Sequence, residues 1–248
     1  MKRIERKHLK ENELAQWLDT TRDFVETRKR AIATVAVIVV FFVLGIVGIG
    51  MWRERSQTAG QQALAEALVA LNAPVVPTGV QGAEGVPAAA QLGAEGTFST
   101  EQAKLEVAIP KLQAAADAYP GTSSGIQARY HLAAALASLG RNEDAIAAFD
   151  AVIERAGEDS FYGRMARLGK ADTQARAGEL DAAIESWKGM TDETDELPVD
   201  AILMQLARAY AQQGNTEEAR KTFTEIVDNH PNSPYSPEAR TELENLKG

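Results

Sequence analysis

The chain has no cysteine among its 248 residues, few aromatic residues (6%) and only three histidines. A disulfide scaffold, a thiol nucleophile and a cysteine-ligated zinc site are therefore excluded. Acidic residues outnumber basic ones, 35 against 26, which excludes a free basic nucleic-acid-binding protein. The sequence also lacks a Gly-rich phosphate loop and a nucleophile-elbow pattern. We therefore expect no enzyme activity, no cofactor, no metal site and no small-molecule substrate.

One segment of the chain is long, apolar and uncharged. Residues 31–52 read AIATVAVIVVFFVLGIVGIGMW, 22 residues without a charged side chain. A helix of this length spans about 33 Å, enough to cross the hydrocarbon core of a bilayer. A core helix rarely runs this far without a polar residue, and 30 residues precede the run, more than a cleaved signal peptide would have. Because no cysteine is available for a lipid anchor, the sequence predicts one uncleaved transmembrane helix.

The charges on the two sides of this run differ in sign. Residues 1–30 carry nine Lys and Arg against six Asp and Glu, whereas residues 56–248 carry 15 against 28. The positive-inside rule places the basic side in the cytoplasm. We expect residues 1–30 to form a basic amphipathic segment that either lies on anionic lipid or docks a partner. Residues 53–248 are expected in the periplasm, on the outer side of the bacterial inner membrane.

The distal segment contains an internal repeat with helical periodicity. The glycines Gly140, Gly178 and Gly214 are spaced 38 and 36 residues apart, and each has an Ala seven residues before it and five after it. An aromatic residue follows each glycine by nine positions: Phe149, Trp187 and Phe223. Gly ends one helix in a left-handed turn, Ala lets two helices approach, and the aromatic fills the space between hairpins. Because such hairpins cannot bury their apolar faces alone, the pattern predicts an all-α solenoid.

A partial fourth copy is predicted at residues 104–129, with its first helix at residues 56–72. The run Ser99-Thr100-Glu101-Gln102 has the form of a capping box. We expect Pro110 to break or kink the helix that begins there. Between the two helices, residues 73–99 contain three Pro, five Gly and no Lys or Arg, which predicts a disordered or loosely looped insertion.

The spacing of Gly, Ala and aromatic residues resembles the tetratricopeptide repeat. A basic cytoplasmic segment, one transmembrane helix and distal tetratricopeptide repeats together resemble the bacterial ancillary SecYEG translocon subunit family. That resemblance implies a non-enzymatic, membrane-anchored module for protein–protein interaction, which docks beside the translocon and assists periplasmic chaperones. The alternative is a structural scaffold subunit of an envelope complex, such as a secretion, division or motility machine.

In tetratricopeptide solenoids the first helix of each hairpin lines the ligand-binding groove, which implies nine candidate groove residues here. They are Gln127, Tyr130, His131, Asp172, Arg176, Met204, Gln205, Arg208 and Gln212. Tyr130 and Ala134 stand where the family's carboxylate clamp has Lys and Asn, so binding of chaperone C-termini is not implied. What remains is a mixed polar and apolar groove able to adapt to varied peptides, or an ordinary solenoid surface.

Overall fold

The computed structural model describes residues 34, 38, 40–76, 97–191 and 197–246. The chain forms two compact units, Met1–Arg55 and Ser56–Gly248. The basic segment predicted at residues 1–30 lies outside the described residues, as does the central part of the insertion, residues 77–96.

The described part of the first unit is helical and apolar. Residues 40–55 are helical throughout. Their large apolar side chains are exposed over more than half of their surface, with Phe41 at 71%, Phe42 at 70% and Trp52 at 69%. Among the described residues, no helix combines the length and the apolar character needed to cross a membrane.

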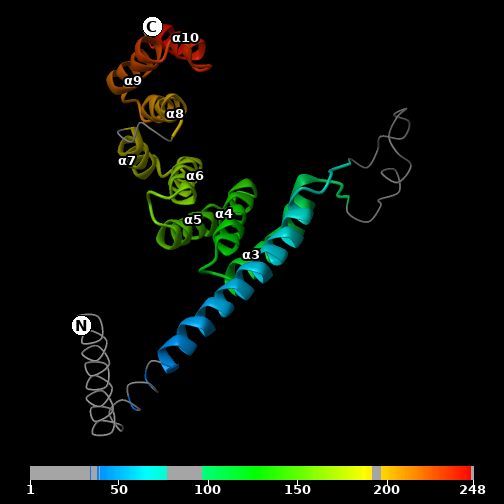
Figure 1. Ribbon diagram of the computed structural model, residues 1–248. Coiled ribbons are helices and arrows are strands. Elements are labelled where there is room, and N and C mark those ends of the chain that lie inside the picture. The colour runs from blue at the N-terminus through cyan, green and yellow to red at the C-terminus, as the bar shows by residue number, and fades with distance from the viewer. Residues whose placement is uncertain (1–33, 35–37, 39, 77–96, 192–196, 247–248) are drawn as a thin grey trace, which may run out of the picture. The chain divides into compact units, whose positions relative to one another are not determined.

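The second unit is built from helices that pack in sequence order. After a first helical stretch at residues 56–71 come α3 (Glu101–Ala118), α4 (Ser123–Ser138), α5 (Asn142–Ala156), α6 (Phe161–Ala177), α7 (Leu180–Thr191), α8 (Val199–Gln212), α9 (Thr216–Asn229) and α10 (Ser236–Asn245). Each helix from α3 onward contacts the next, and α4 also contacts α6 (Figure 1). The predicted all-α arrangement of stacked hairpins is confirmed.

The three repeat glycines end the first helix of each hairpin as predicted. Gly140, Gly178 and Gly214 have φ angles of 72°, 87° and 77°, a left-handed conformation that costs glycine little. In each turn the N–H of the residue after the glycine donates to a carbonyl in the last helical turn, as Glu179 N does to Gln174 O at 2.9 Å. This is the Schellman arrangement, which satisfies carbonyls left open at a helix end.

The first helices α4 and α6 begin with the same cap, which the sequence analysis did not identify. The hydroxyl oxygens of Thr122 and Ser160 each accept a hydrogen bond, at 3.0 Å, from the N–H of the residue three positions on. Those residues are Gly125 and Gly163, and a Cβ at either would lie within 2 Å of a backbone carbonyl oxygen. Glycine is therefore required at the third position of these two helices.

Two expectations about α3 are wrong. Thr100 caps the helix alone, because its Oγ1 accepts from Ala103 N at 3.1 Å while the side chain of Gln102 donates to Glu106 at 2.9 Å. The helix also continues unbroken through Pro110, so the predicted break is wrong and the predicted kink stays a prediction. Pro110 and Glu106 are both exposed, so water can bond the Glu106 carbonyl that has lost its N–H partner.

The two ends of the insertion are tied together. Val75 and Phe98 form an isolated parallel β-bridge, in which Val76 N donates to Phe98 O at 2.8 Å and Phe98 N donates to Pro74 O at 3.0 Å. The insertion therefore leaves and re-enters the solenoid at one place. The looseness predicted for residues 73–99 stays a prediction for the part outside the described residues.

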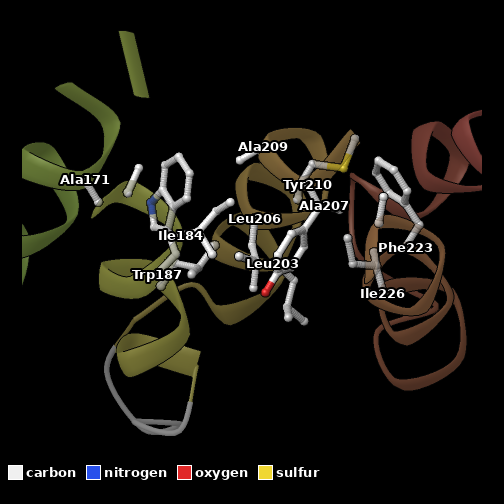
Figure 2. Packing of buried hydrophobic residues seen from close by; sticks show 14 of the residues in the cluster. Ala171, Ile184, Trp187, Leu203, Leu206, Ala207, Ala209, Tyr210, Phe223 and Ile226 are labelled. Atoms are coloured by element: carbon white, nitrogen blue, oxygen red, sulfur yellow. The ribbon is translucent and has the colours of Figure 1, made fainter. Parts of the chain in front are cut away.

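Small and aromatic residues of the repeat fill the core. The aromatic residues Phe149, Trp187 and Phe223 are 3%, 2% and 1% exposed, as the spacing predicted. The alanines flanking each repeat glycine are fully buried: Ala133, Ala145, Ala171, Ala183, Ala207 and Ala219. Figure 2 shows Trp187 and Phe223 on either side of the α8 side chains, each filling the space beside its own hairpin.

Candidate functional site

The nine candidate groove residues all lie on first helices of hairpins, namely α4, α6 and α8. Arg176, Arg208 and Gln212 are exposed, and most of the others are half-buried. Met204 differs, because it is only 1% exposed and belongs to the hydrophobic core. Met204 is therefore a packing residue, and its assignment to a ligand-binding surface is wrong.

Tyr130 stands at the centre of an aromatic cluster between α4 and α6. Its ring centroid lies 5.7 Å from that of His131, 5.7 Å from that of Tyr162 and 6.0 Å from that of Phe149. Phe161 extends the cluster, 5.2 Å from Tyr162 and in an edge-to-face arrangement with it. Such tilted contacts are the favourable geometry for aromatic pairs.

Phe161 is the most exposed member of this cluster. It is 65% exposed, although the ring of the next residue, Tyr162, packs against the core. Neither Phe161 nor Tyr162 was among the predicted groove residues. The signal available in the sequence was the Phe-Tyr pair directly after Ser160, at the start of a first helix.

Burial sets the protonation behaviour of the cluster. Burial raises the pKa of Tyr130, and the negative charges of Tyr162 and Asp172 raise it further. The pKa of Tyr162 is raised by burial, and the pKa of His131 is lowered for the same reason. At neutral pH the two hydroxyls and the imidazole are therefore neutral, and the cluster presents uncharged rings with polar edges.

The carboxylate of Asp172 acts on this cluster through its charge. Burial raises the pKa of its carboxyl, while Arg176 and the Trp187 indole lower it. The Trp187 Nε1 lies near the carboxylate without the geometry of a hydrogen bond. Among the described residues, Asp172 Oδ1 and Trp187 Nε1 are both buried without a hydrogen-bond partner. The Arg176 guanidinium donates instead to Asp172 O at 3.3 Å and Thr173 Oγ1 at 3.2 Å.

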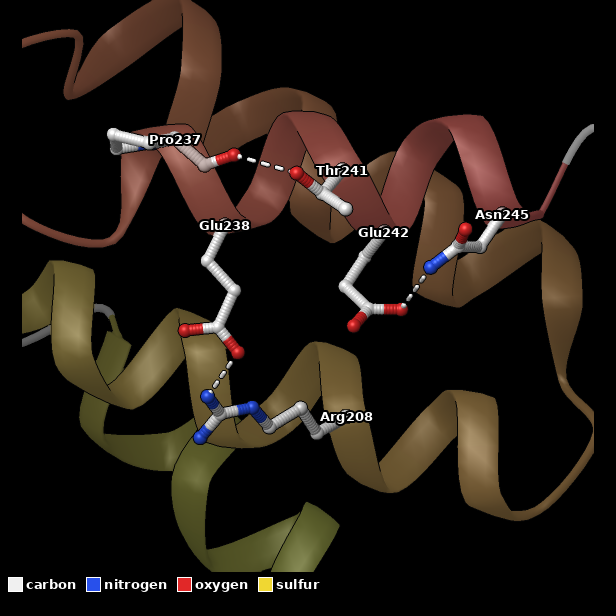
Figure 3. A network of polar contacts seen from close by, with 6 residues as sticks. All are labelled: Arg208, Pro237, Glu238, Thr241, Glu242 and Asn245. Atoms are coloured by element: carbon white, nitrogen blue, oxygen red, sulfur yellow. Dashed lines mark hydrogen bonds and ion pairs between the residues drawn. The ribbon is translucent and has the colours of Figure 1, made fainter.

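Arg208, on α8, is engaged by the terminal helix. Its guanidinium forms an ion pair with Glu238 of α10, and Figure 3 shows the two side chains reaching across the space between these helices. Both side chains remain almost half exposed, at 44% and 45%. Sequence reasoning did not predict Glu238 as a neighbour, because the two residues are 30 positions apart.

The arrangement supports non-covalent binding. Across the described residues, no group of three or more His, Asp or Glu side chains is placed to hold a metal ion. The structure brings Tyr130, His131 and Asp172 together and supplies exposed apolar surface at Phe161. Rings with polar edges suit contact with another polypeptide.

Known families match two stretches of the second unit. A family model described as tetratricopeptide repeat matches residues 101–161, which include α3, α4 and α5. Another model of the same description matches residues 201–233, which include most of α8 and all of α9. No curated protein matches the chain.

Solved structures share the fold at low sequence identity. A tetratricopeptide repeat protein from Parabacteroides merdae ATCC 43184 is 18% identical, with a TM-score of 0.50 over 60% of this chain and 56% of that one. A Podosopora anserina chain of nearly identical TPR-like repeats, described as a candidate kinesin light chain, is 17% identical, with a TM-score of 0.50 over 59% of this chain and 79% of that one. The chain thus spans little more than half the length of the Parabacteroides protein.

Helical hairpins, left-handed glycine turns, family matches and fold neighbours agree. Tetratricopeptide-repeat proteins are generally non-enzymatic and bind other proteins. Residues 101–161 and 201–233 thus match tetratricopeptide repeats, which are typical of modules for protein–protein interaction, and the second unit has the fold of such repeats.

Proposed function

We propose that this chain is a membrane-anchored interaction module of the bacterial inner membrane. Residues 1–30 lie in the cytoplasm, residues 31–52 cross the membrane and residues 53–248 lie in the periplasm. The 22 uncharged residues and the excess of Lys and Arg before them support this topology. So does the exposure of Phe41, Phe42 and Trp52, since water is a poor environment for such side chains.

The proposed partners are the protein translocon or periplasmic chaperones. This assignment is supported by the order of segments along the chain, which resembles that of the ancillary translocon subunits. A module of this kind would hold folding factors close to polypeptides that emerge from the membrane. The acidic character of residues 56–248, 28 Asp and Glu against 15 Lys and Arg, keeps such a domain soluble at high local concentration.

The aromatic cluster on α4 and α6 is the proposed contact surface. The observation that carries this is the 65% exposure of Phe161 beside the packed rings of Tyr162 and Tyr130. An aromatic side chain gains the most free energy when a partner removes it from water, and little ordering entropy is lost because its neighbours are already fixed. We expect the partner to cover Phe161 with an apolar side chain.

Photocrosslinking in native membranes tests the contact surface and the partner together. A benzophenone amino acid replaces Phe161 in one strain and Lys221, which is exposed on α9, in a control strain. We expect translocon subunits or periplasmic folding factors to crosslink at position 161 and not at position 221. Identical products from both positions, or products without any of these proteins, would reject the proposal. Stoichiometric recovery with a secretion or motility machine would favour the scaffold function.

The topology has a separate test, made simple by the lack of cysteine. Single variants Lys7→Cys and Lys221→Cys are treated with a membrane-impermeant maleimide in spheroplasts. We expect Lys221→Cys to be labelled at once and Lys7→Cys only after lysis. The reverse labelling order would place the repeat domain in the cytoplasm.

A further inference from the structure

The hydrophobic core of the second unit is divided into two large clusters that meet inside α6. The first, here called the amino-proximal core, includes Leu112, Leu136 and Phe149 and ends at Ala166. The second is the carboxy-proximal core, whose buried residues start at Ala171 and include Trp187 and Phe223, with the partly buried Leu168 packed against them. Residues that share one cluster lose and regain their contacts together, so separate clusters favour separate cooperative units.

The residues between the two cores, 167–170, are here called the seam, and two contacts join them to α5. The Phe149 ring lies against Gly169, where an added Cβ would be 2.5 Å from the ring. One position on, Lys170 Nζ lies 2.6 Å from Asp150 Oδ1 on α5, with side-chain exposures of 27% and 51%. An ion pair this exposed contributes little, and it tolerates changes in geometry better than interdigitated apolar side chains do.

Unsatisfied polar atoms lie just beyond the seam. Asp172 Oδ1, Gln174 Oε1 and Trp187 Nε1 are buried with no hydrogen-bond partner in the described part of the chain. A buried polar atom without a partner carries the full cost of leaving water. All three lie on α6 and α7 on the carboxy-proximal side of the seam, where a bend in α6 that admits water lets them form hydrogen bonds.

We propose that α6 is a hinge about residues 167–170, where the helices up to Ala166 and those from Ala171 onward form two cooperative units. The proposed contact surface at Tyr130 and Phe161 lies on the amino-proximal side of this hinge, and the candidate groove residues of α8 lie on the other. Motion at α6 therefore changes their separation and lets one domain take ligands of different length. The hinge follows from the packing alone and does not depend on the identity of the partner.

Native-state hydrogen exchange on the full chain in nanodiscs tests for two cooperative units. Leu112 and Phe223 are 0% and 1% exposed, one in each core. We expect Leu112→Ala to accelerate exchange about a hundredfold in α3–α5 with less than about threefold change in α8 and α9, and Phe223→Ala to do the reverse. Equal acceleration of both halves by either variant would overturn the proposal.

A pair of smaller substitutions keeps the test valid if the larger ones prevent folding. Val152→Ala and Ile226→Val also remove buried methyl groups, from the amino-proximal and the carboxy-proximal core respectively. We expect about threefold to tenfold faster exchange confined to the half that carries the substitution. Acceleration that spreads evenly over both halves would again mean one cooperative unit.

Spin-label distances test the motion itself. Because the chain has no cysteine, labels at Ala147→Cys and Glu225→Cys report on α5 and α9 across the seam, and labels at Lys111→Cys and Ala147→Cys report within one half. We expect a broader distance distribution across the seam than within the half. We also expect Gln174→Leu, which removes an unpartnered amide oxygen, to narrow only the distribution across the seam. Equal widths for the two pairs would contradict a hinge at α6.

Discussion

The ring of Phe149 lies directly on the backbone of Gly169, and this contact fixes how closely α5 and α6 pack. A Cβ at residue 169 would lie 2.5 Å from Cζ of the ring, well inside any tolerated carbon–carbon distance. The same position of the repeat, nine residues before each repeat glycine, holds His131 in the copy before and Gln205 in the copy after. At Gly169 the Phe149 ring occupies the space that a side chain would take.

Gly169→Ala is therefore expected to destabilise the domain. Alanine improves helix propensity by about 1 kcal/mol, but overpacking against a buried ring costs typically 1–3 kcal/mol, so the net loss should be up to about 2 kcal/mol. Urea unfolding followed by circular dichroism measures this difference.

Gly189 on α7 supplies the matched control for that substitution. A Cβ at residue 189 would meet only the end of the Arg167 side chain, at 4.0 Å. Gly189→Ala should therefore stabilise the domain, by up to about 1 kcal/mol, through helix propensity alone. If Gly169→Ala were as stable as Gly189→Ala, the Phe149 contact would have to be loose in solution.

The cap glycine of α4 gives a second prediction. A Cβ at Gly125 would lie 1.8 Å from the carbonyl oxygen of Tyr119, so Gly125→Ala must displace the turn that carries the Thr122 cap. We expect a loss of about 2–3 kcal/mol, the sum of overpacking and a lost cap. Gly121→Ala, where the added Cβ meets nothing within 4 Å, should change stability by less than about 0.5 kcal/mol. Thermal melts of both variants make the comparison, and equal losses would contradict the prediction.

Much of the fold was predictable because the spacing of glycine and aromatic residues in the repeat reflects the geometry of the helical hairpin. The turns between helices are made at Gly140, Gly178 and Gly214. The buried aromatic residues of the core are Phe149, Trp187 and Phe223. Sequence spacing alone located both sets. The two features missed at helix starts, Gly125 and Gly163, depend on how a turn folds back on its helix. Sequence spacing does not encode that approach.

The binding surface was predictable only in part. Tyr130, Leu168 and Met204 occupy one position of the repeat, ten residues before each glycine. Tyr130 is half-buried, Leu168 packs against the carboxy-proximal core and Met204 is 1% exposed. A periodicity argument assigns the three to one face. Whether that face is open depends on the neighbouring helix, which differs in each copy.

The Arg208–Glu238 ion pair should contribute little to stability. Both side chains are almost half exposed, and exposed pairs are worth about 0–1 kcal/mol. We expect Glu238→Gln to lower the free energy of unfolding by no more than about 0.5 kcal/mol, and less at 1 M salt, where screening is stronger. Denaturant titration at two salt concentrations checks this, with Glu242→Gln on the same helix as control. A loss above 2 kcal/mol would mean that the pair holds α10 in place.

Asp172 gives a pH-dependent prediction whose sign follows from its raised pKa. Because burial raises the pKa of this carboxyl in the folded state, folding favours its protonated form, and its ionisation lowers stability as the pH rises through that pKa. Asp172→Asn removes the charge, so we expect it to stabilise the domain at pH 7. The gain should disappear as the pH falls to about 3.9, where the wild-type carboxyl is also protonated.

Urea titrations of wild type and Asp172→Asn between pH 4 and pH 7 measure this difference directly. The exposed Asp228 on α9 provides the control, since Asp228→Asn should change stability by less than about 0.5 kcal/mol throughout. A less stable Asp172→Asn at pH 7 would show that the attraction of Arg176 and the Trp187 indole outweighs the cost of burial. In that case Asp172 would hold α6 and α7 together within the carboxy-proximal half.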